Sequence, residues 1–129
     1  MGRRWQDGTG TLTVAGDGKG GVADSGGGAQ IPVEVAASYR SRTRGLLGRA
    51  GIDGALLLTP AGSVHTFRMR FAIDVAYLDR HLRVLAVRTM PPGRLGLPRL
   101  RSRHVLEAEA GALARWGIRP GSHLRVTPD

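Results

Sequence analysis

An aspartate inside an apolar run is the residue of this chain whose position most calls for a chemical explanation. Asp74 lies within residues 71–78, where every other side chain is apolar or aromatic. Burying an unpaired carboxylate is costly, so such a group is usually paired, hydrogen-bonded or protonated. The chain offers Arg44 and Arg88 as candidate partners. We expect a structural ion pair that fixes the fold, in preference to a carboxylate that faces a ligand.

A second constellation combines His65 with Asp74 and Glu107. Imidazole and carboxylate groups could bind a divalent metal, or exchange protons with a substrate, if they converged in the fold. No His-x-His or His-Glu-x-x-His element supports a metal site. We therefore predict no metal and no cofactor. Acid–base catalysis by Asp74 or Glu107 stays open as an alternative function.

The absence of cysteine excludes several chemistries at once. Disulfides, thiolate catalysis and cysteine-ligated zinc are all impossible, and a reducing compartment suits such a chain. The N-terminus turns polar where a signal peptide would need an apolar stretch, and the apolar runs are too short to span a membrane. We expect a cytoplasmic protein with no membrane span.

The chain is basic, with a formal net charge of +9. Four arginines stand among leucines in the segment 94–103, which could contact phosphates or an acidic partner. This segment has no aromatic residue on which bases could stack. The preference for arginine over lysine also fits the codon usage of a GC-rich genome. We expect no specific nucleic-acid binding, and keep an arginine-rich nucleic-acid-associated protein as a second alternative.

The elements that must position these residues are short strands. Alternating or continuous apolar stretches separated by Gly, Pro and Asp turns are typical of a β-rich domain. They predict strands at 10–14, 31–35, 55–59, 64–70, 71–78, 82–89, 103–110 and 123–126, and short helices at 39–47 and 112–116. This list predicts a mainly β protein, a compact antiparallel β-barrel or sandwich of about seven or eight short strands with two short helices.

A chain of 129 residues with 41% hydrophobic content is long enough for one domain with a real core. We assign residues 1–8 to an N-terminal tail and 9–129 to a single β-rich domain. The glycine-rich segment 15–30 is predicted to be a flexible insertion between two strands of a β-hairpin. We expect a monomer.

Six ordered blocks of sequence resemble a known family. They are Arg44-Gly-Leu-Leu-Gly-Arg49, His65-Thr-Phe-x-Met69, Ile73-Asp-Val75, Thr89-Met-Pro-Pro92, His104-Val-Leu-Glu-Ala108 with Gly111, and Gly117-Ile-x-x-Gly121. This arrangement, across residues 33–126, resembles the bacterial and archaeal family called domain of unknown function 192. The resemblance implies a small β-rich domain without an established activity. The chain departs from the family pattern at Arg68, where Trp is usual, and at Phe71-Ala72, where Asn-Thr is frequent.

The six sequence blocks also indicate which residues form the candidate site. Arg44 opens the first block, which makes it the leading partner for Asp74. We expect a cleft near these two residues, walled by Phe67, Met69, Met90 and Leu106, that binds a small polar ligand or a peptide segment. A binding or accessory module is thus the preferred function, with its ligand or protein partner unidentified. The candidate ligand-binding residues are Arg44, His65, Phe67, Met69, Asp74, Met90 and Glu107.

Overall fold

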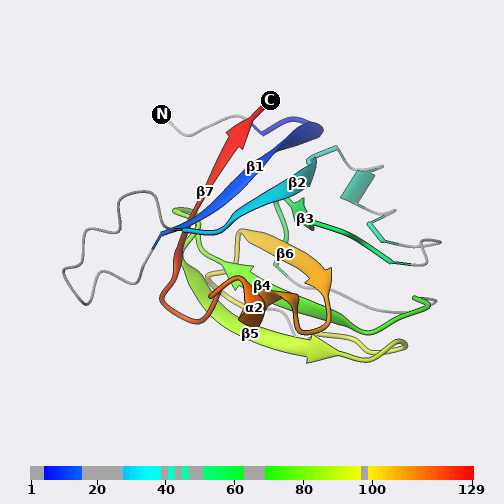
Figure 1. The fold of residues 1–129 in the computed structure, drawn as a ribbon. Helices are drawn as coiled ribbons and strands as arrows, with labels where there is room; N and C mark the ends of the chain where they lie inside the picture. Colours follow the sequence, from blue (N-terminus) through cyan, green and yellow to red (C-terminus); the bar gives the residue numbers. More distant parts are fainter. Residues whose placement is uncertain are drawn as a thin grey trace.

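The computed structural model describes residues 5–15, 28–38, 41–42, 45–46, 51–62, 69–96 and 99–129. Seven strands form one curled sheet in the spatial order β5-β4-β6-β3-β2-β1-β7 (Figure 1). In chain order the elements are β1 (Gly8–Ala15), β2 (Gln30–Ala36), β3 (Ala55–Leu58), β4 (Ile73–Leu78), β5 (Val84–Met90), β6 (His104–Glu109), α2 (Ala112–Arg115) and β7 (His123–Pro128). The expected mainly β fold is confirmed, and it takes the form of a half-barrel.

Neighbouring strands are antiparallel except for β2 and β3, which run parallel. Residues 37–54 carry the chain from the end of β2 back to the start of β3, and a parallel pair needs such a crossover. The expected antiparallel sheet therefore contains one parallel pair.

The two edge strands approach each other at one end of the sheet. Arg83 and His123 form a β-bridge, with the Val84 N–H donating to the Ser122 carbonyl at 2.8 Å and the Leu124 N–H donating to the Leu82 carbonyl at 2.9 Å. These bonds join the start of β5 to the start of β7, and they convert the curled sheet into a half-barrel that is closed at this end.

Two hydrophobic clusters lie on opposite faces of the sheet. The inner cluster draws side chains from all seven strands and fills the concave face; it includes Leu12, Val33, Leu57, Ala76, Val84, Leu106, Ala108, Leu113 and Val126. The outer cluster draws on β2 to β6 and includes Leu46, Leu56, Met69, Ile73, Val75, Tyr77, Met90 and Val105. Because both faces are covered at β4, all six of its residues are buried.

The expected secondary structure coincides with these elements where the structure describes the chain. The helix expected at 112–116 is α2. Of the helix expected at 39–47, Ser41 and Arg42 are helical, whereas Gly45 and Leu46 form a turn in which Gly45 has φ of 48°; the other residues lie outside the described ranges. Residues 64–68 of the strand expected at 64–70 lie outside the described residues, and the prediction is wrong at Met69 and Arg70, which are not in a strand. Most of the glycine-rich segment also lies outside the described residues. No helix in the described ranges is long and apolar enough to cross a membrane.

Candidate functional site

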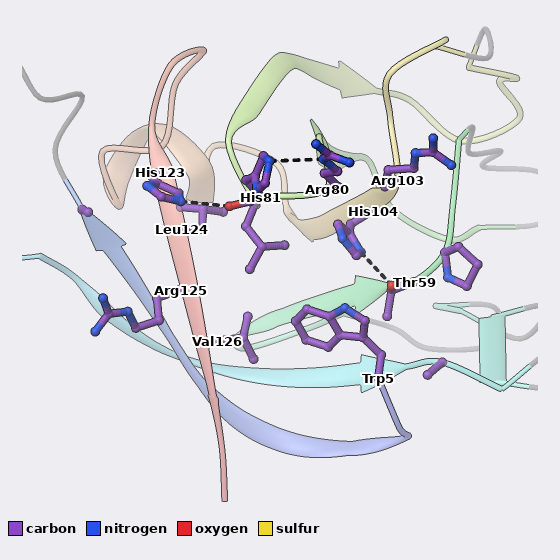
Figure 2. A pocket seen from close by; sticks show the side chains of 14 residues that line it. Trp5, Thr59, Arg80, His81, Arg103, His104, His123, Leu124, Arg125 and Val126 are labelled. Carbon is purple, nitrogen blue, oxygen red and sulfur yellow. Dashed lines mark hydrogen bonds between the residues drawn. The ribbon is translucent and has the colours of Figure 1, made fainter. Parts of the chain in front are cut away.

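A cavity of about 890 Å³ opens where the end of β3, the start of β6, the turn between β4 and β5, and the start of β7 meet (Figure 2). Its lining combines three groups of side chains. The cationic group comprises Arg80, Arg103 and Arg125, the imidazoles are His81, His104 and His123, and the apolar wall includes Trp5, Leu82, Leu124 and Val126. None of the described lining residues is acidic.

The turn between β4 and β5 positions the first arginine and imidazole. The Asp79 carboxylate accepts hydrogen bonds from the backbone N–H groups of His81 at 2.8 Å and Arg83 at 3.0 Å, which is the local bonding that favours Asp in turns. Leu82 adopts a left-handed conformation with φ of 64°. This fixed backbone holds Arg80 and His81 side by side.

Hydrogen bonds of side chains also hold together the residues at the opening of the cavity. Arg80 Nε donates to His81 Nε2 at 3.2 Å, and His123 Nε2 donates to the His81 carbonyl oxygen at 2.9 Å (Figure 2). The turn that precedes the edge strand β5 and the start of the other edge strand, β7, thus present basic groups at one opening.

His104 forms the buried polar part of the cavity. Its Nδ1 lies 2.6 Å from Thr59 Oγ1, and its ring meets the Trp5 indole edge to face with centroids 5.4 Å apart. Burial lowers the pKa of His104 below its usual value of 6.5; the Asp79 carboxylate opposes this shift, and the Arg103 charge adds to it. The imidazole is therefore neutral at physiological pH.

Asp7 holds the segment that carries Trp5. Its carboxylate accepts hydrogen bonds from the backbone N–H groups of Ala37 at 2.6 Å and Ser38 at 2.8 Å, and from the Ser41 hydroxyl at 2.8 Å. The bonds from Ser38, Ser41 and Ala37 hold the pKa of Asp7 well below its usual range. The indole is thereby tied to the residues that follow β2.

Asp74 lies away from this cavity, in a network that joins the sheet to α2. Its Oδ1 accepts from the Thr89 hydroxyl at 2.6 Å, and its Oδ2 accepts from the backbone N–H groups of Gly111 at 2.9 Å and Leu113 at 3.2 Å. Gly111 has φ of 90°, a conformation that glycine adopts without a steric penalty. The expected partner Arg44 lies outside the described residues. Arg88 is exposed, and its guanidinium donates to the Val87 carbonyl oxygen.

Glu107 lies on the opposite face of the sheet from Asp74. In the antiparallel register Glu107 stands opposite Val75, whereas Asp74 stands opposite Ala108. Directly opposed residues share a face and successive residues alternate, so the two carboxylates point in opposite directions. The acid–base pair considered from sequence therefore does not converge.

Glu107 is nevertheless unusual in its own right. It is 3% exposed, and burial raises its pKa to about 7. A Cβ placed on Gly45, in the first family block, would lie 3.8 Å from Glu107 Oε1. The first and fifth blocks of the sequence pattern thus meet at this carboxyl group.

The other expected site residues divide between the two faces. Met69 and Met90 belong to the outer cluster, the face of Glu107, whereas Leu106 belongs to the inner cluster. The expected cleft with all these walls is therefore not formed, because neighbouring strand positions alternate between faces. His65 and Phe67 lie outside the described residues. Within the described part of the chain, no group of three or more His, Asp or Glu side chains could hold a metal ion.

Sequence reasoning did not predict this cavity, although Arg103 lies in the basic segment 94–103 and His104 begins the fifth family block. The lining residues come from segments far apart in the chain, and most lie in turns or at strand ends, where no periodic pattern marks them. One signal was available: an arginine directly precedes a histidine twice, as Arg80-His81 and as Arg103-His104, and His123 lies two residues before Arg125. Each of these pairs lines the cavity.

Comparisons with known proteins found a matching family, similar sequences and similar solved structures. The profile of the family described as "Uncharacterized ACR", domain of unknown function 192, matches residues 22–126. A UPF0127 protein of Pyrococcus horikoshii is 32% identical over 84 residues, covering 61% of this chain and 73% of the relative. A UPF0127 protein of Thermococcus kodakarensis is 29% identical over 102 residues, covering 74% of this chain and 65% of the relative.

Two crystal structures share the fold. A protein of Sinorhizobium meliloti, described as a candidate transcription regulator, has a TM-score of 0.73 at 18% identity, covering 96% of this chain and 98% of that one. A protein of unknown function from Novosphingobium aromaticivorans has a TM-score of 0.69 at 21% identity, covering 89% and 83% of the two chains. At these identities the likeness concerns the fold alone.

Proposed function

The chain belongs to the domain of unknown function 192 family, and we propose that it is a binding module for a small organic anion with an apolar body. The observation that carries this proposal is the cavity that Arg80, Arg103 and Arg125 line together with several apolar side chains. Pockets for small molecules are typically apolar hollows with a few placed polar groups, as this one is.

The cationic rim favours a carboxylate or phosphate group on the ligand. Arginine guanidinium groups match the planar oxygens of such anions and bind them through paired hydrogen bonds. No described lining residue offers a competing carboxylate. An anion at the rim therefore gains charge-assisted hydrogen bonds without repulsion from the lining.

The inner part of the cavity favours an apolar portion of the ligand. Trp5, Leu82 and Leu124 supply apolar surface, and His104 with Thr59 supplies one buried polar group. Because the His104 imidazole is neutral, it offers one hydrogen bond and no charge at the inner end. Inorganic phosphate would use the rim alone, and a ligand with an apolar body would use both parts.

Binding measurements with a set of anions test whether the cavity has a cationic part and an apolar part. We expect octanoate and adenosine monophosphate to raise the melting temperature and to bind in titration calorimetry at least about tenfold more tightly than inorganic phosphate. The neutral analogue octanamide should bind much more weakly than octanoate. Quenching or a shift of Trp5 fluorescence on binding would place the ligand in the cavity.

Matched variants locate the site. Arg103→Gln should weaken octanoate binding about tenfold, because it removes a charge-assisted hydrogen bond. Arg88→Gln removes an exposed arginine that does not line the cavity, and should leave binding unchanged. If no anion binds, or if both variants weaken binding equally, the proposal is wrong.

A further inference from the structure

A fully exposed leucine stands at the tip of a turn that is itself firmly bound to the domain. Leu100 is 99% exposed. The Ser102 N–H donates to the Arg99 carbonyl oxygen at 3.0 Å, a bond that closes a β-turn with Leu100 and Arg101 at its centre. We refer to residues 99–102 as the leucine turn.

Three further hydrogen bonds anchor the leucine turn on both sides. The Arg99 N–H donates to the Gly62 carbonyl at 3.0 Å, the Ser102 hydroxyl donates to the Ala61 carbonyl at 3.0 Å, and the Arg103 N–H donates to the Leu78 carbonyl at 2.8 Å. The Arg99 guanidinium also lies 4.7 Å from the centre of the buried Tyr77 ring. The turn is thus held in a conformation that presents Leu100 to solvent, although the outer cluster lies beside it.

The sequence on both sides of Leu100 is strongly basic. Between Asp79 and Glu107 the chain has seven arginines and no acidic residue. Arg101 and Arg103, on the C-terminal side of Leu100, are both exposed. Earlier in the same stretch Leu95, which follows Arg94, is 64% exposed. Leu100 is therefore an exposed apolar residue that exposed arginines follow closely in the sequence.

From this juxtaposition we propose that the leucine turn docks on an anionic lipid surface, with Leu100 inserted among the acyl chains and Arg101 and Arg103 on the headgroup phosphates. Peripheral binding of this kind combines buried apolar area with attraction to anionic lipid. A nucleic acid would satisfy the arginines, but its outer surface of phosphates and sugars offers Leu100 far less apolar area than the acyl chains of a bilayer, and the turn has no aromatic side chain for base stacking. Arg103 also lines the proposed ligand cavity, whereas Leu100 and Arg101 do not, so variants of Leu100 and Arg101 test the docking separately from ligand binding.

Vesicle sedimentation of the full chain tests the proposal. We expect binding to phosphatidylcholine vesicles that contain about one third phosphatidylglycerol, and little binding to pure phosphatidylcholine. Leu100→Ala should reduce the partition coefficient about tenfold, and Arg101→Gln about fivefold. Arg88→Gln, an exposed arginine of β5 outside the turn, is the matched control for general charge and should change it by less than about twofold.

A fluorescent variant tests insertion directly. Leu100→Trp should show a blue-shifted emission and quenching by brominated lipid beyond the signal of the native Trp5 and Trp116. Because Leu100 is fully exposed, these variants should melt at the wild-type temperature. Partition that is insensitive to Leu100→Ala would overturn the proposal. Binding to a DNA duplex without vesicle binding would also overturn it and assign the arginines to nucleic acid.

Discussion

Glu107 is a carboxyl group that the fold withdraws from water, and no described residue donates a hydrogen bond to it. Burial raises its pKa from 4.5 to about 7. The folded protein therefore binds more protons than the unfolded chain within this interval, and this group lowers stability as the pH rises through it. Above the folded pKa the full penalty applies, about 3 kcal/mol for a shift of this size.

Glu107→Gln removes this penalty, because glutamine does not ionise. We expect the variant to be more stable than wild type by up to about 3 kcal/mol at about pH 8, and the advantage to vanish at about pH 4. Urea denaturation across this range measures it. A variant that is less stable at every pH would show that the carboxylate is stabilised by a partner.

His104 gives a pH dependence of the opposite sign. Its pKa is lowered in the folded protein, so below 6.5 the unfolded chain binds more protons and stability falls as the pH falls. We expect His104→Gln to reduce the decrease in the free energy of unfolding as the pH falls from about 7 to about 5, as measured by urea denaturation. The comparison is best made in the Glu107→Gln background, where the opposing titration is absent. Equal slopes with and without His104 would contradict the prediction.

At the scale of elements, Asp74 joins three parts of the fold through one carboxylate. It binds Thr89 of β5 and the backbone at the start of α2, while lying itself in β4. The short helix has no side-chain cap of its own, so the N–H groups near its start depend on this residue.

Asp74→Asn should therefore destabilise the protein by about 2 kcal/mol or more, because a neutral amide oxygen accepts the hydrogen bonds from the backbone N–H groups of Gly111 and Leu113 more weakly than a carboxylate does. Thr89→Val removes a single hydrogen bond at an exposed position, and should cost about 1 kcal/mol. Denaturant unfolding measures both. Wild-type stability in Asp74→Asn would show that the carboxylate is not structural.

At the scale of elements, the alternation of apolar and polar side chains predicts strands but does not predict which strands are neighbours. The alternating side chains of β2 predicted that strand and its buried face, and the apolar run of β4, interrupted only by Asp74, predicted a strand buried on both sides. Alternation says nothing of which strand is the neighbour, so the parallel pairing of β2 with β3 could not be predicted. It also assigned Asp74 and Glu107 to strands without revealing that their opposed register places them on opposite faces.

At the scale of the whole molecule, the cavity was beyond sequence reasoning for a physical reason. Trp5, Thr59, Arg80, His104 and His123 meet only because the sheet curls and its edge strands join. The adjacent arginine and histidine residues indicated basic, imidazole-rich positions. Their convergence depends on closure of the half-barrel, which is a property of the complete sheet.

Removal of β7 tests how far the molecule depends on that closure. Deleting residues 123–129 takes away Leu124 and Val126 from the inner cluster and leaves one edge of β1 without a partner. We expect loss of cooperative thermal unfolding, monitored by circular dichroism, because the loss of two buried aliphatic side chains alone removes several kcal/mol. A cooperative transition near the wild-type temperature would show that the remaining six strands suffice.

The pairing of β1 with β7 also has a consequence for how the chain is made. Ala15 pairs with His123 and Gly10 with Pro128, so more than a hundred residues separate the two strands along the chain. During synthesis β1 can pair with β2 early, but its other hydrogen-bonding edge waits until β7 leaves the ribosome. An unpaired strand edge can recruit other chains. The nascent protein is therefore most exposed to misassembly before its last strand emerges.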